Sequence, residues 1–416
     1  MKVYVNVSPT AKYGGNTGIQ RVVRELCNVL DNKEFYGLNF KFIVFVSPDT
    51  WINYSDYSSY LKLIDAQWSN KILRIMKSPI NKYLPKAIRH QIGCINLKIK
   101  KYSAEKKYLL SNKIFDNAVL VNLDAGWIDD WQYLQSLKLP QIQVIYDIIP
   151  ITHPQFCSSA HIKNFSTWLY RAIGSSIAII SISKSAMKDI EVFTIREGFR
   201  NLIYKYFYLG ADFDAISNRD IQPKNISINN QYFIAVGSIE PRKNHATLLN
   251  AFHEYKSHGG NWDLIIVGRA SDHTSEVLKA IKNSVHFGTN LHWVNDASDI
   301  QLDAYYRSAG AVIVPSFVEG FGLPLIEALH YGKPVIASDI AVFREIGGNS
   351  VIYFPVQASD ILAKNMLEIS SGVTVKPQLQ ALDIKYLNWS ESGSMFAKVI
   401  SEIIDKKGYR RVTHYS

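Results

Sequence analysis

The sequence contains few cysteines and no long uninterrupted hydrophobic run. Only three of its 416 residues are cysteines, Cys27, Cys94 and Cys157, and their spacing does not form a C-x-x-C metal or redox pair. No apolar run approaches the ~18 residues of a membrane-spanning helix, and the first residues lack the apolar core of a signal peptide. These absences argue against a disulfide-stapled fold and predict a soluble protein of a reducing, cytoplasmic compartment.

Acidic residues are scarce in one segment, and this scarcity accounts for the net charge of +10. Residues 71–107 contain 11 Lys and Arg but a single acid, Glu105, whereas the rest of the chain has 35 basic and 35 acidic residues. Pro79 and Pro85 interrupt the segment, so short helical pieces are expected rather than one continuous helix. Such a local excess predicts a surface that faces an anionic partner, with a solvated basic face as the plainer alternative.

The hydrophobic pattern predicts an α/β protein with two domains. At about 100–200 residues per domain, 416 residues suffice for two. Short apolar runs rich in β-branched residues alternate with helical patterns, which is typical of parallel sheets covered on both faces. The expected strands are residues 3–7, 42–46, 118–121, 142–146 and 177–182 in the first block, and 232–236, 264–267, 291–294, 311–314, 335–337 and 351–354 in the second.

The predicted architecture is two doubly wound, Rossmann-like domains that face each other across a cleft, with ligands at the carboxyl ends of the strands. An Asn-rich stretch with few large apolar residues precedes the second block and is interpreted as a linker. The predicted boundaries are an N-terminal domain over 1–210, a linker over 211–231, a C-terminal domain over 232–387 and C-terminal helices over 388–416.

A glycine-rich turn follows the first expected strand. Gly14, Gly15 and Gly18 precede a helical pattern, and Thr17 with Gln20 forms a capping box that predicts a helix start at Thr17. Backbone N–H groups at a helix N-terminus can approach an anion, which makes Gly15 and Gly18 candidates for ligand binding. A tight turn that needs glycine for its backbone conformation explains the pattern equally well.

Two adjacent cations follow the first strand of the second block. Gly237 and Ser238 close that strand, and Arg242 and Lys243 stand where the next helix opens. Arg binds phosphate oxygens with a planar fork and Lys with a point charge, so the pair suits a diphosphate. A solvated surface pair is the alternative.

The segment 315–329 contains two glutamates eight positions apart. Glu319 lies in a glycine loop, and Pro324 suits the first position of a helix whose first turn includes Glu327, so both carboxylates are expected to face the cleft. For Glu327 alone, an acid favoured by the helix dipole is the alternative. Amides beside a carboxylate suit a sugar diphosphate, because amides bind phosphate and acids bind hydroxyls. The loop residues concerned are Gly320, Phe321, Gly322 and Leu323.

These motifs resemble the retaining glycosyltransferases of family 4, which have the GT-B fold. Glu319 and Glu327 match the family's E-x7-E motif, and the segments 236–244 and 332–338 fall in the family's order. Residues 17–21 resemble its N-terminal glycine loop, so the resemblance covers nearly the whole chain. It implies that the C-terminal domain binds a nucleotide sugar, that the N-terminal domain binds the acceptor, and that the last helices cross back onto the first domain.

The resemblance also implies roles for individual residues. Arg242 and Lys243 are expected to hold the diphosphate, Glu319 to contact the sugar and Glu327 the ribose. The expected donor-binding set is Gly15, Gly18, Gly237, Ser238, Arg242, Lys243, Glu319, Gly320, Phe321, Gly322, Leu323 and Glu327.

One segment departs from the family pattern. Members often carry His-Asp at a strand end where this sequence has Tyr146 and Asp147. Asp147 is retained, so it is assigned to the catalytic group together with Glu319, Arg242 and Lys243. His153 stands nearby in the sequence and is interpreted as a polar loop residue rather than a base.

No metal or cofactor is expected. Asp212 and Asp214 form a D-x-D pattern, as in metal-dependent glycosyltransferases of the other major fold, but so short a pattern is weak and is interpreted as structural. The 11 histidines show no H-E-x-x-H or comparable ligand cluster.

The predicted activity is transfer of one hexose, with mannose or a deoxyhexose favoured, from a nucleotide diphosphate sugar to a lipid-linked or oligosaccharide acceptor. The resemblance implies a place in bacterial surface-glycan synthesis, of O-antigen or capsule. Residues 71–107, with apolar side chains among their cations, are then expected to dock peripherally on the anionic cytoplasmic face of the membrane. A sugar-nucleotide epimerase or hydrolase of the same fold is one alternative. A nucleic-acid-binding protein is a weaker one, because it does not explain the carboxylate loop, and no nucleic-acid partner is expected.

Overall fold

The structure is a computed structural model that describes residues 1–13, 18–47, 50–59, 61, 110–127, 134, 137, 139–212, 231–270, 275–372 and 387–409. The chain forms two compact units. The first comprises Met1–Val144, Ser175–Ile177 and Ile404–Ser416, and the second comprises Ile145–Gly174 and Ala178–Ile403. Several predicted features lie outside the described residues, namely Gly14, Gly15 and Thr17, the basic segment 71–107, and residues 213–230 of the linker.

The first unit contains strands in the order β2-β3-β1-β5-β6, with β4 paired to β3. β1 runs parallel to β3 and β5, and β5 runs parallel to β6, whereas β2 and β4 pair with β3 in antiparallel fashion. Val3, Val5 and Val121 are fully buried, as expected of strands covered on both faces. The strands are β1 (Lys2–Asn6), β2 (Glu34–Phe35), β3 (Leu38–Ser47), β4 (Thr50–Asn53), β5 (Ala118–Asn122) and β6 (Gln141–Val144).

Helices α1 (Ser8–Tyr13) and α2 (Gly18–Leu30) follow β1, and the short 3-10 helix η2 (Asn112–Phe115) precedes β5. α2 buries one stripe at helical spacing, which includes Val22, Val23 and Leu26. The helix predicted after the first glycine turn is therefore present, and it begins at Gly18.

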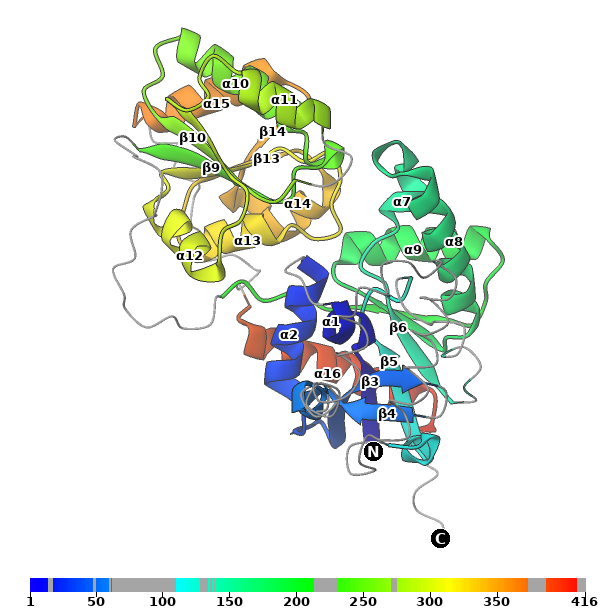
Figure 1. Ribbon diagram of the computed structural model, residues 1–416. Coiled ribbons are helices and arrows are strands. Elements are labelled where there is room, and N and C mark those ends of the chain that lie inside the picture. The colour runs from blue at the N-terminus through cyan, green and yellow to red at the C-terminus, as the bar shows by residue number, and fades with distance from the viewer. Residues whose placement is uncertain are drawn as a thin grey trace, which may run out of the picture. The chain divides into compact units, whose positions relative to one another are not determined.

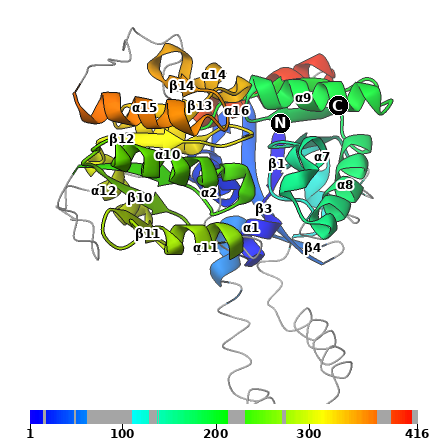
Figure 2. The same ribbon diagram turned by 90° about the horizontal axis from the view of Figure 1, so that it is seen from above.

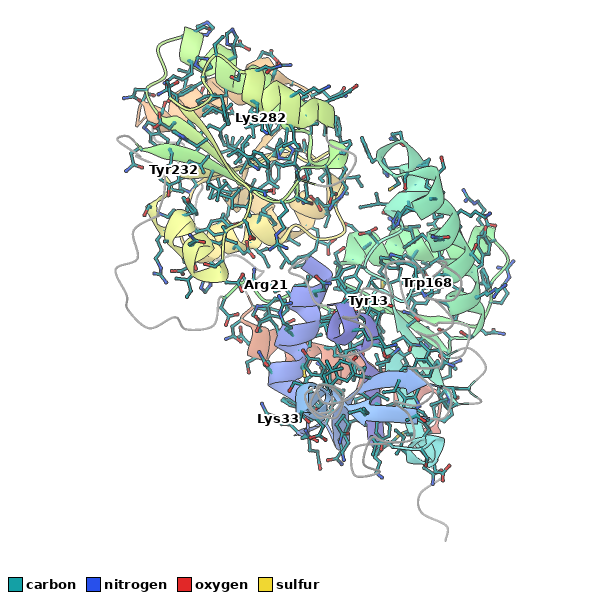
Figure 3. All side chains as sticks on the ribbon, in the orientation of Figure 1. Tyr13, Arg21, Lys33, Trp168, Tyr232 and Lys282 are labelled. Atoms are coloured by element: carbon teal, nitrogen blue, oxygen red, sulfur yellow. The ribbon has the colours of Figure 1, made fainter. Side chains whose placement is uncertain are left out.

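The second unit begins with short helices and a parallel pair of strands. β7 (Ala178–Ser181) pairs with β8 (Ile203–Tyr206), and Trp168, labelled in Figure 3, is buried on the helix before β7. The helices of this segment are α7 (Ile149–Thr152), η3 (Pro154–Phe156), α8 (Ser159–Gly174) and α9 (Lys184–Arg196). The last helix, α16 (Trp389–Lys406), packs Phe396 against Phe207 with ring centroids 4.8 Å apart.

A six-stranded parallel sheet forms the larger part of the second unit, in the order β11-β10-β9-β12-β13-β14. The direction of winding reverses between β9 and β12, and ligands of doubly wound sheets bind at the carboxyl ends of strands at such a reversal. The strands are β9 (Tyr232–Val236), β10 (Asp263–Val267), β11 (Leu291–Val294), β12 (Ala311–Val314), β13 (Val335–Ser338) and β14 (Ile352–Phe354).

Helices cover both faces of this sheet. In Figure 1, α10, α11 and α15 lie on one face and α12, α13 and α14 on the other, and α10 and α15 are adjacent in Figure 2 as well. Tyr232, labelled in Figure 3 at the start of β9, donates its hydroxyl to the backbone carbonyl of Tyr305 at 2.8 Å. The helices are η4 (Pro241–Lys243), α10 (His245–Ser257), α11 (Ser275–Asn283), α12 (Asp299–Ser308), α13 (Leu323–His330), α14 (Ala341–Gly347), η5 (Gly348–Ser350) and α15 (Ser359–Ser370).

The predicted α/β class is confirmed, and each expected strand segment overlaps a strand of the structure. Strands β2, β4 and β8 were not predicted, because they are short or carry polar residues between their apolar ones. Among the described residues, no helix combines the length and the apolar character needed to cross a membrane.

Candidate active site

Glu319 lies in the loop that joins β12 to α13. The loop passes through buried Ser316, whose hydroxyl donates to Glu319 Oε1 at 2.8 Å. Only 8% of the Glu319 side chain is exposed. A carboxylate that has lost most of its water needs opposite charges nearby to remain ionised.

Arg242 and Lys243 supply those charges from η4, which follows β9, the neighbour of β12 in the sheet. Arg242 Nη1 lies 2.8 Å from Glu319 Oε2, and Lys243 Nζ lies 2.5 Å from Glu319 Oε1. The backbone N–H of Phe317 donates to the Arg242 carbonyl at 2.8 Å, so main chain also joins the two loops. The structure thus brings together three residues that the sequence assigned to one site.

These contacts determine the charge of Glu319. Burial alone would raise the pKa of this carboxyl group, but Arg242 and Lys243 outweigh burial and hold the pKa at about 2. Burial likewise opposes the charge of Arg242, yet Glu319 and Glu240 raise the pKa of its guanidinium above the ordinary value. At neutral pH the site therefore contains an ionised glutamate between two cations.

Glu240 extends the network and was not identified from the sequence. Its carboxylate accepts a hydrogen bond from Arg242 Nε at 2.9 Å and another from the Ser238 hydroxyl at 2.5 Å. The one signal was its position two residues before Arg242, which does not distinguish it from any other loop acid. Ser316 was also not identified, because nothing in the sequence distinguishes it from other loop serines.

Gly237 makes room for the second cation. Its φ of +144° is a backbone conformation that L side chains rarely adopt. A Cβ at this position would lie 3.3 Å from Lys243 Cε. Gly237 therefore adjoins Lys243, whereas Ser238 is linked to Arg242 through Glu240.

The glycine loop after Glu319 packs against the segment that contains Asp147. A Cβ on Gly320 would lie 3.0 Å from Asp147 Oδ2 and 3.0 Å from the Tyr146 carbonyl oxygen, so any larger residue here would need these neighbours to move by a few tenths of an ångström. Phe321 is buried, and Gly322, with φ of +110°, caps the helix that begins at Leu323.

Asp147 lies between β6 and α7, and its Oδ1 accepts the N–H of Ile149 at 3.0 Å. Burial, assisted by the negative charge of Glu319, raises the pKa of the Asp147 carboxyl, while the Ile149 N–H and Arg242 act in the opposite direction. Asp147 thus belongs to the same electrostatic cluster as Glu319. His153 lies in the turn between α7 and η3, where its Nδ1 is 2.9 Å from the Thr152 hydroxyl.

Glu327 differs from its prediction in position. α13 begins at Leu323, so Pro324 is its second residue rather than its first, and Glu327 is its fifth, beyond the first turn. The side chain is buried, and its Oε2 accepts the Tyr306 hydroxyl of α12 at 2.7 Å. The prediction placed this helix one residue too late, because the left-handed Gly322 ends the loop. The ribose contact stays a prediction.

The first of the two acids in the D-x-D pattern has a structural role. Asp212 Oδ1 accepts the backbone N–H of Trp389 at 2.7 Å, and its carbonyl accepts the Trp389 indole N–H at 3.1 Å, which holds the start of α16. Asp214 and Gly15 lie outside the described residues, and Gly18 is the first residue of α2 in the other unit. Among the described residues, no three His, Cys, Asp or Glu side chains are grouped to hold a metal ion.

Comparison with known families places these residues in a recognised pattern. Residues 217–372, which include both cations and both glutamates, match the family of glycosyl transferases group 1. The chain is 26% identical over 410 residues to the serotype-specific mannosyltransferase WbdA of Escherichia coli, covering 95% of this chain and 46% of WbdA. It is 32% identical over 142 residues to the O-antigen chain mannosyltransferase RfbU of Salmonella typhimurium, covering 34% of this chain and 38% of RfbU. The chain therefore spans about half the length, or less, of these relatives.

Solved structures resemble the whole chain, and two of them illustrate the likeness. The sucrose-phosphate synthase of Thermosynechococcus elongatus has a TM-score of 0.55 at 16% identity, with 100% of both chains covered. HepE of Anabaena, solved in complex with UDP and glucose, has a TM-score of 0.53 at 14% identity, with 99% of this chain and 100% of HepE covered. Likeness at these identities shows the fold. The chain thus has the predicted GT-B fold, and residues 217–372 carry the sequence pattern of the group 1 glycosyl transferases.

Proposed function

We propose that the chain is a retaining glycosyltransferase of bacterial surface-glycan synthesis. It transfers a hexose, with mannose or a deoxyhexose favoured, from a nucleotide diphosphate sugar to a lipid-linked or oligosaccharide acceptor. The observation that carries the proposal is the ionised Glu319 between Arg242 and Lys243, at the carboxyl ends of β9 and β12. The names of WbdA and RfbU support mannosyl transfer, and that of RfbU supports a place in O-antigen synthesis.

Arg242 and Lys243 act on the leaving group. When the bond between the anomeric carbon and the donor phosphate breaks, negative charge develops on the departing diphosphate. The guanidinium offers a planar fork of donors and the ammonium a point charge, and both are already held at one place by Glu319. The two cations supply the charge that a metal ion would otherwise provide, so we propose a metal-independent reaction.

Glu319 acts on the sugar through its charge. With a pKa of about 2 it has no proton to donate at neutral pH. It can accept hydrogen bonds from sugar hydroxyls and stabilise the positive charge that develops on the sugar ring during transfer. The acceptor hydroxyl then attacks from the face that the diphosphate leaves, which retains the configuration.

Asp147 acts on the acceptor side. Its raised pKa makes this carboxylate a better proton acceptor than an exposed aspartate, which suits a group that faces an attacking hydroxyl. It lies beside Gly320, the residue after Glu319, and interacts electrostatically with both Glu319 and Arg242.

The test is a thermal-shift screen of the full chain against sugar nucleotides, among them GDP-mannose, GDP-fucose, UDP-glucose and dTDP-rhamnose. A donor that binds the folded state raises the melting temperature. Glu319→Ala and Lys243→Ala are then assayed for sugar transfer with that donor and methyl α-mannoside as a probe acceptor. Absence of any shift, or normal transfer by both variants, would contradict the proposal.

An epimerase or hydrolase of the same fold would share the donor site but need no acceptor. Incubation of the protein with its donor alone separates the two activities. Release or isomerisation of the sugar at the same rate with and without acceptor would favour the alternative.

We further propose that residues 71–107 hold the protein on the cytoplasmic face of an anionic membrane. The support is the confinement of the positive excess to this segment. Each cation near such a surface contributes about 1 kcal/mol. Co-sedimentation with vesicles that contain phosphatidylglycerol is compared for wild type and a variant with Lys71, Arg74, Lys77, Lys82 and Lys86 changed to Gln. Equal binding of both proteins, or binding that ignores the anionic lipid content, would refute this part.

A further inference from the structure

Ser183 contacts the site loop from outside the predicted site. It is fully buried and is the N-cap of α9, where its Oγ accepts the N–H of Ala186 at 3.0 Å. The same hydroxyl donates to the carbonyl of Gly320 at 2.8 Å. A serine hydroxyl has one proton to donate and lone pairs to accept, so it can make both bonds at once.

The Gly320 carbonyl belongs to the same peptide unit as the N–H of Phe321. Because a trans peptide is planar, its C=O and N–H point in opposite directions, and fixing one fixes the other. Within the part of the chain that the structure describes, the Phe321 N–H has no hydrogen-bond partner. Ser183 therefore holds a peptide whose donor is free, two residues after Glu319.

Glu345 of α14 keeps Ser183 in place. Its carboxylate accepts the backbone N–H groups of Lys184 and Ser185, each at 2.7 Å, and the Ser185 hydroxyl at 2.5 Å. The first turn of α9 thus has carboxylate partners besides its own cap. Loss of the Ser183 hydroxyl should leave the helix in position.

We propose that Ser183 is a positioning residue of the donor site. Its hydroxyl orients the peptide between Gly320 and Phe321, so that the Phe321 N–H is presented to the sugar-linked phosphate of the donor. The inference rests on the proposed function. It adds a requirement: binding of the second phosphate, and not of the nucleoside, should depend on Ser183, which lies 137 positions before Gly320.

The experiment measures binding of GDP and GMP, and of UDP and UMP in parallel, to the full-length protein by calorimetry. Ser183→Ala should weaken binding of the diphosphate that wild type prefers by about fivefold, the effect of one hydrogen bond, and leave the monophosphate unchanged. Ser183→Thr keeps the hydroxyl and should restore the affinity. The matched control is Ser298→Ala, which removes the N-cap of α12 and should alter neither affinity.

Three outcomes would overturn the inference. The first is unchanged diphosphate binding by Ser183→Ala, and the second is an equal loss for mono- and diphosphate, which indicates a merely structural residue. If wild type itself binds no nucleoside diphosphate, the proposed function fails as well, whereas the first two outcomes leave it intact. Should Ser183→Ala not fold, Ser183→Cys keeps the side-chain size with a weaker donor, and the same loss confined to the diphosphate is required.

Discussion

Replacement of Glu319 by Gln isolates the energy of the buried ion pairs. Gln has the shape of the protonated acid but cannot ionise. The pKa of Glu319 is about 2, compared with 4.5 for an ordinary glutamate, and this difference corresponds to about 3 kcal/mol in favour of the folded state at neutral pH. We expect Glu319→Gln to reduce the free energy of unfolding by about that amount, measured by urea denaturation followed by Trp fluorescence.

The pH dependence gives the sign of the effect. Because the pKa is lower in the folded than in the unfolded state, the stabilisation is complete above about pH 5 and is lost as the pH falls through about 2. The difference between wild type and Glu319→Gln should therefore be constant around neutral pH and shrink only in acid. Exposed surface ion pairs contribute about 0–1 kcal/mol, so a difference below about 1 kcal/mol at neutral pH would refute this account of the cluster.

The same variant separates binding from transfer. In the free protein Glu319 forms ion pairs with Arg242 and Lys243, so its replacement by Gln increases the net positive charge offered to a diphosphate, although Arg242 keeps its pair with Glu240. Affinity for the nucleoside diphosphate should stay equal or increase, while kcat falls by about 100-fold, as on loss of other preorganised polar groups. Glu240→Gln is the matched control, because it also removes a carboxylate partner of Arg242 but should have a smaller effect on kcat. Parallel losses of diphosphate binding and kcat in Glu319→Gln would contradict the assignment.

Arg242→Ala or Lys243→Ala should each cost about 2–4 kcal/mol in kcat/KM, and wild-type rates would remove them from the mechanism. EDTA should leave wild-type transfer intact, whereas inactivation reversed by Mg²⁺ or Mn²⁺ would show a metal requirement. Asp147→Asn should slow transfer and leave the donor Kd unchanged, and normal transfer would make Asp147 a structural turn acid. Glu327→Gln should weaken donor binding and change kcat little. Tyr306→Phe, which keeps the carboxylate, should weaken donor binding less than Glu327→Gln does. Identical kinetics in wild type and both variants would exclude the ribose contact.

The strands were predictable wherever burial on both faces requires a continuous run of apolar residues. The segments at 264–267 and 311–314 are strands buried on both faces, and the sequence pattern located both. β8 has the sequence Ile-Tyr-Lys-Tyr, and only Ile203 is buried, so it lacks the continuous apolar run that located the other strands. β2 and β4 are antiparallel additions of a few residues, whose pairing depends on the neighbouring strand rather than on local composition.

The members of the site were predictable, but their partners were not. The glycine loop and the two cations are local patterns, and the sheet order brings them to neighbouring strands. The ion pair between Arg242 and Glu319 joins residues 77 positions apart, and no local pattern specifies which carboxylate a cation meets. For Glu327 the sequence predicted a place in the first turn of the helix, but α13 begins one residue earlier, so Glu327 is its fifth residue. The hydrogen bond that its carboxylate accepts from Tyr306, 21 positions away, was not predictable from a local pattern.

Glu319 and Asp147 have opposite pKa shifts, and we expect this difference to separate the roles that we propose for them. Cations lower the pKa of Glu319, whereas burial and the charge of Glu319 itself raise that of Asp147. The ionised Glu319 thus helps to make Asp147 a stronger base. Pairs of titratable groups whose pKa values are driven apart commonly divide into a permanent charge and a proton carrier. Glycine at position 320 lets the loop lie this close to Asp147, since a Cβ would lie 3.0 Å from Asp147 Oδ2 and its neighbours would have to move by a few tenths of an ångström.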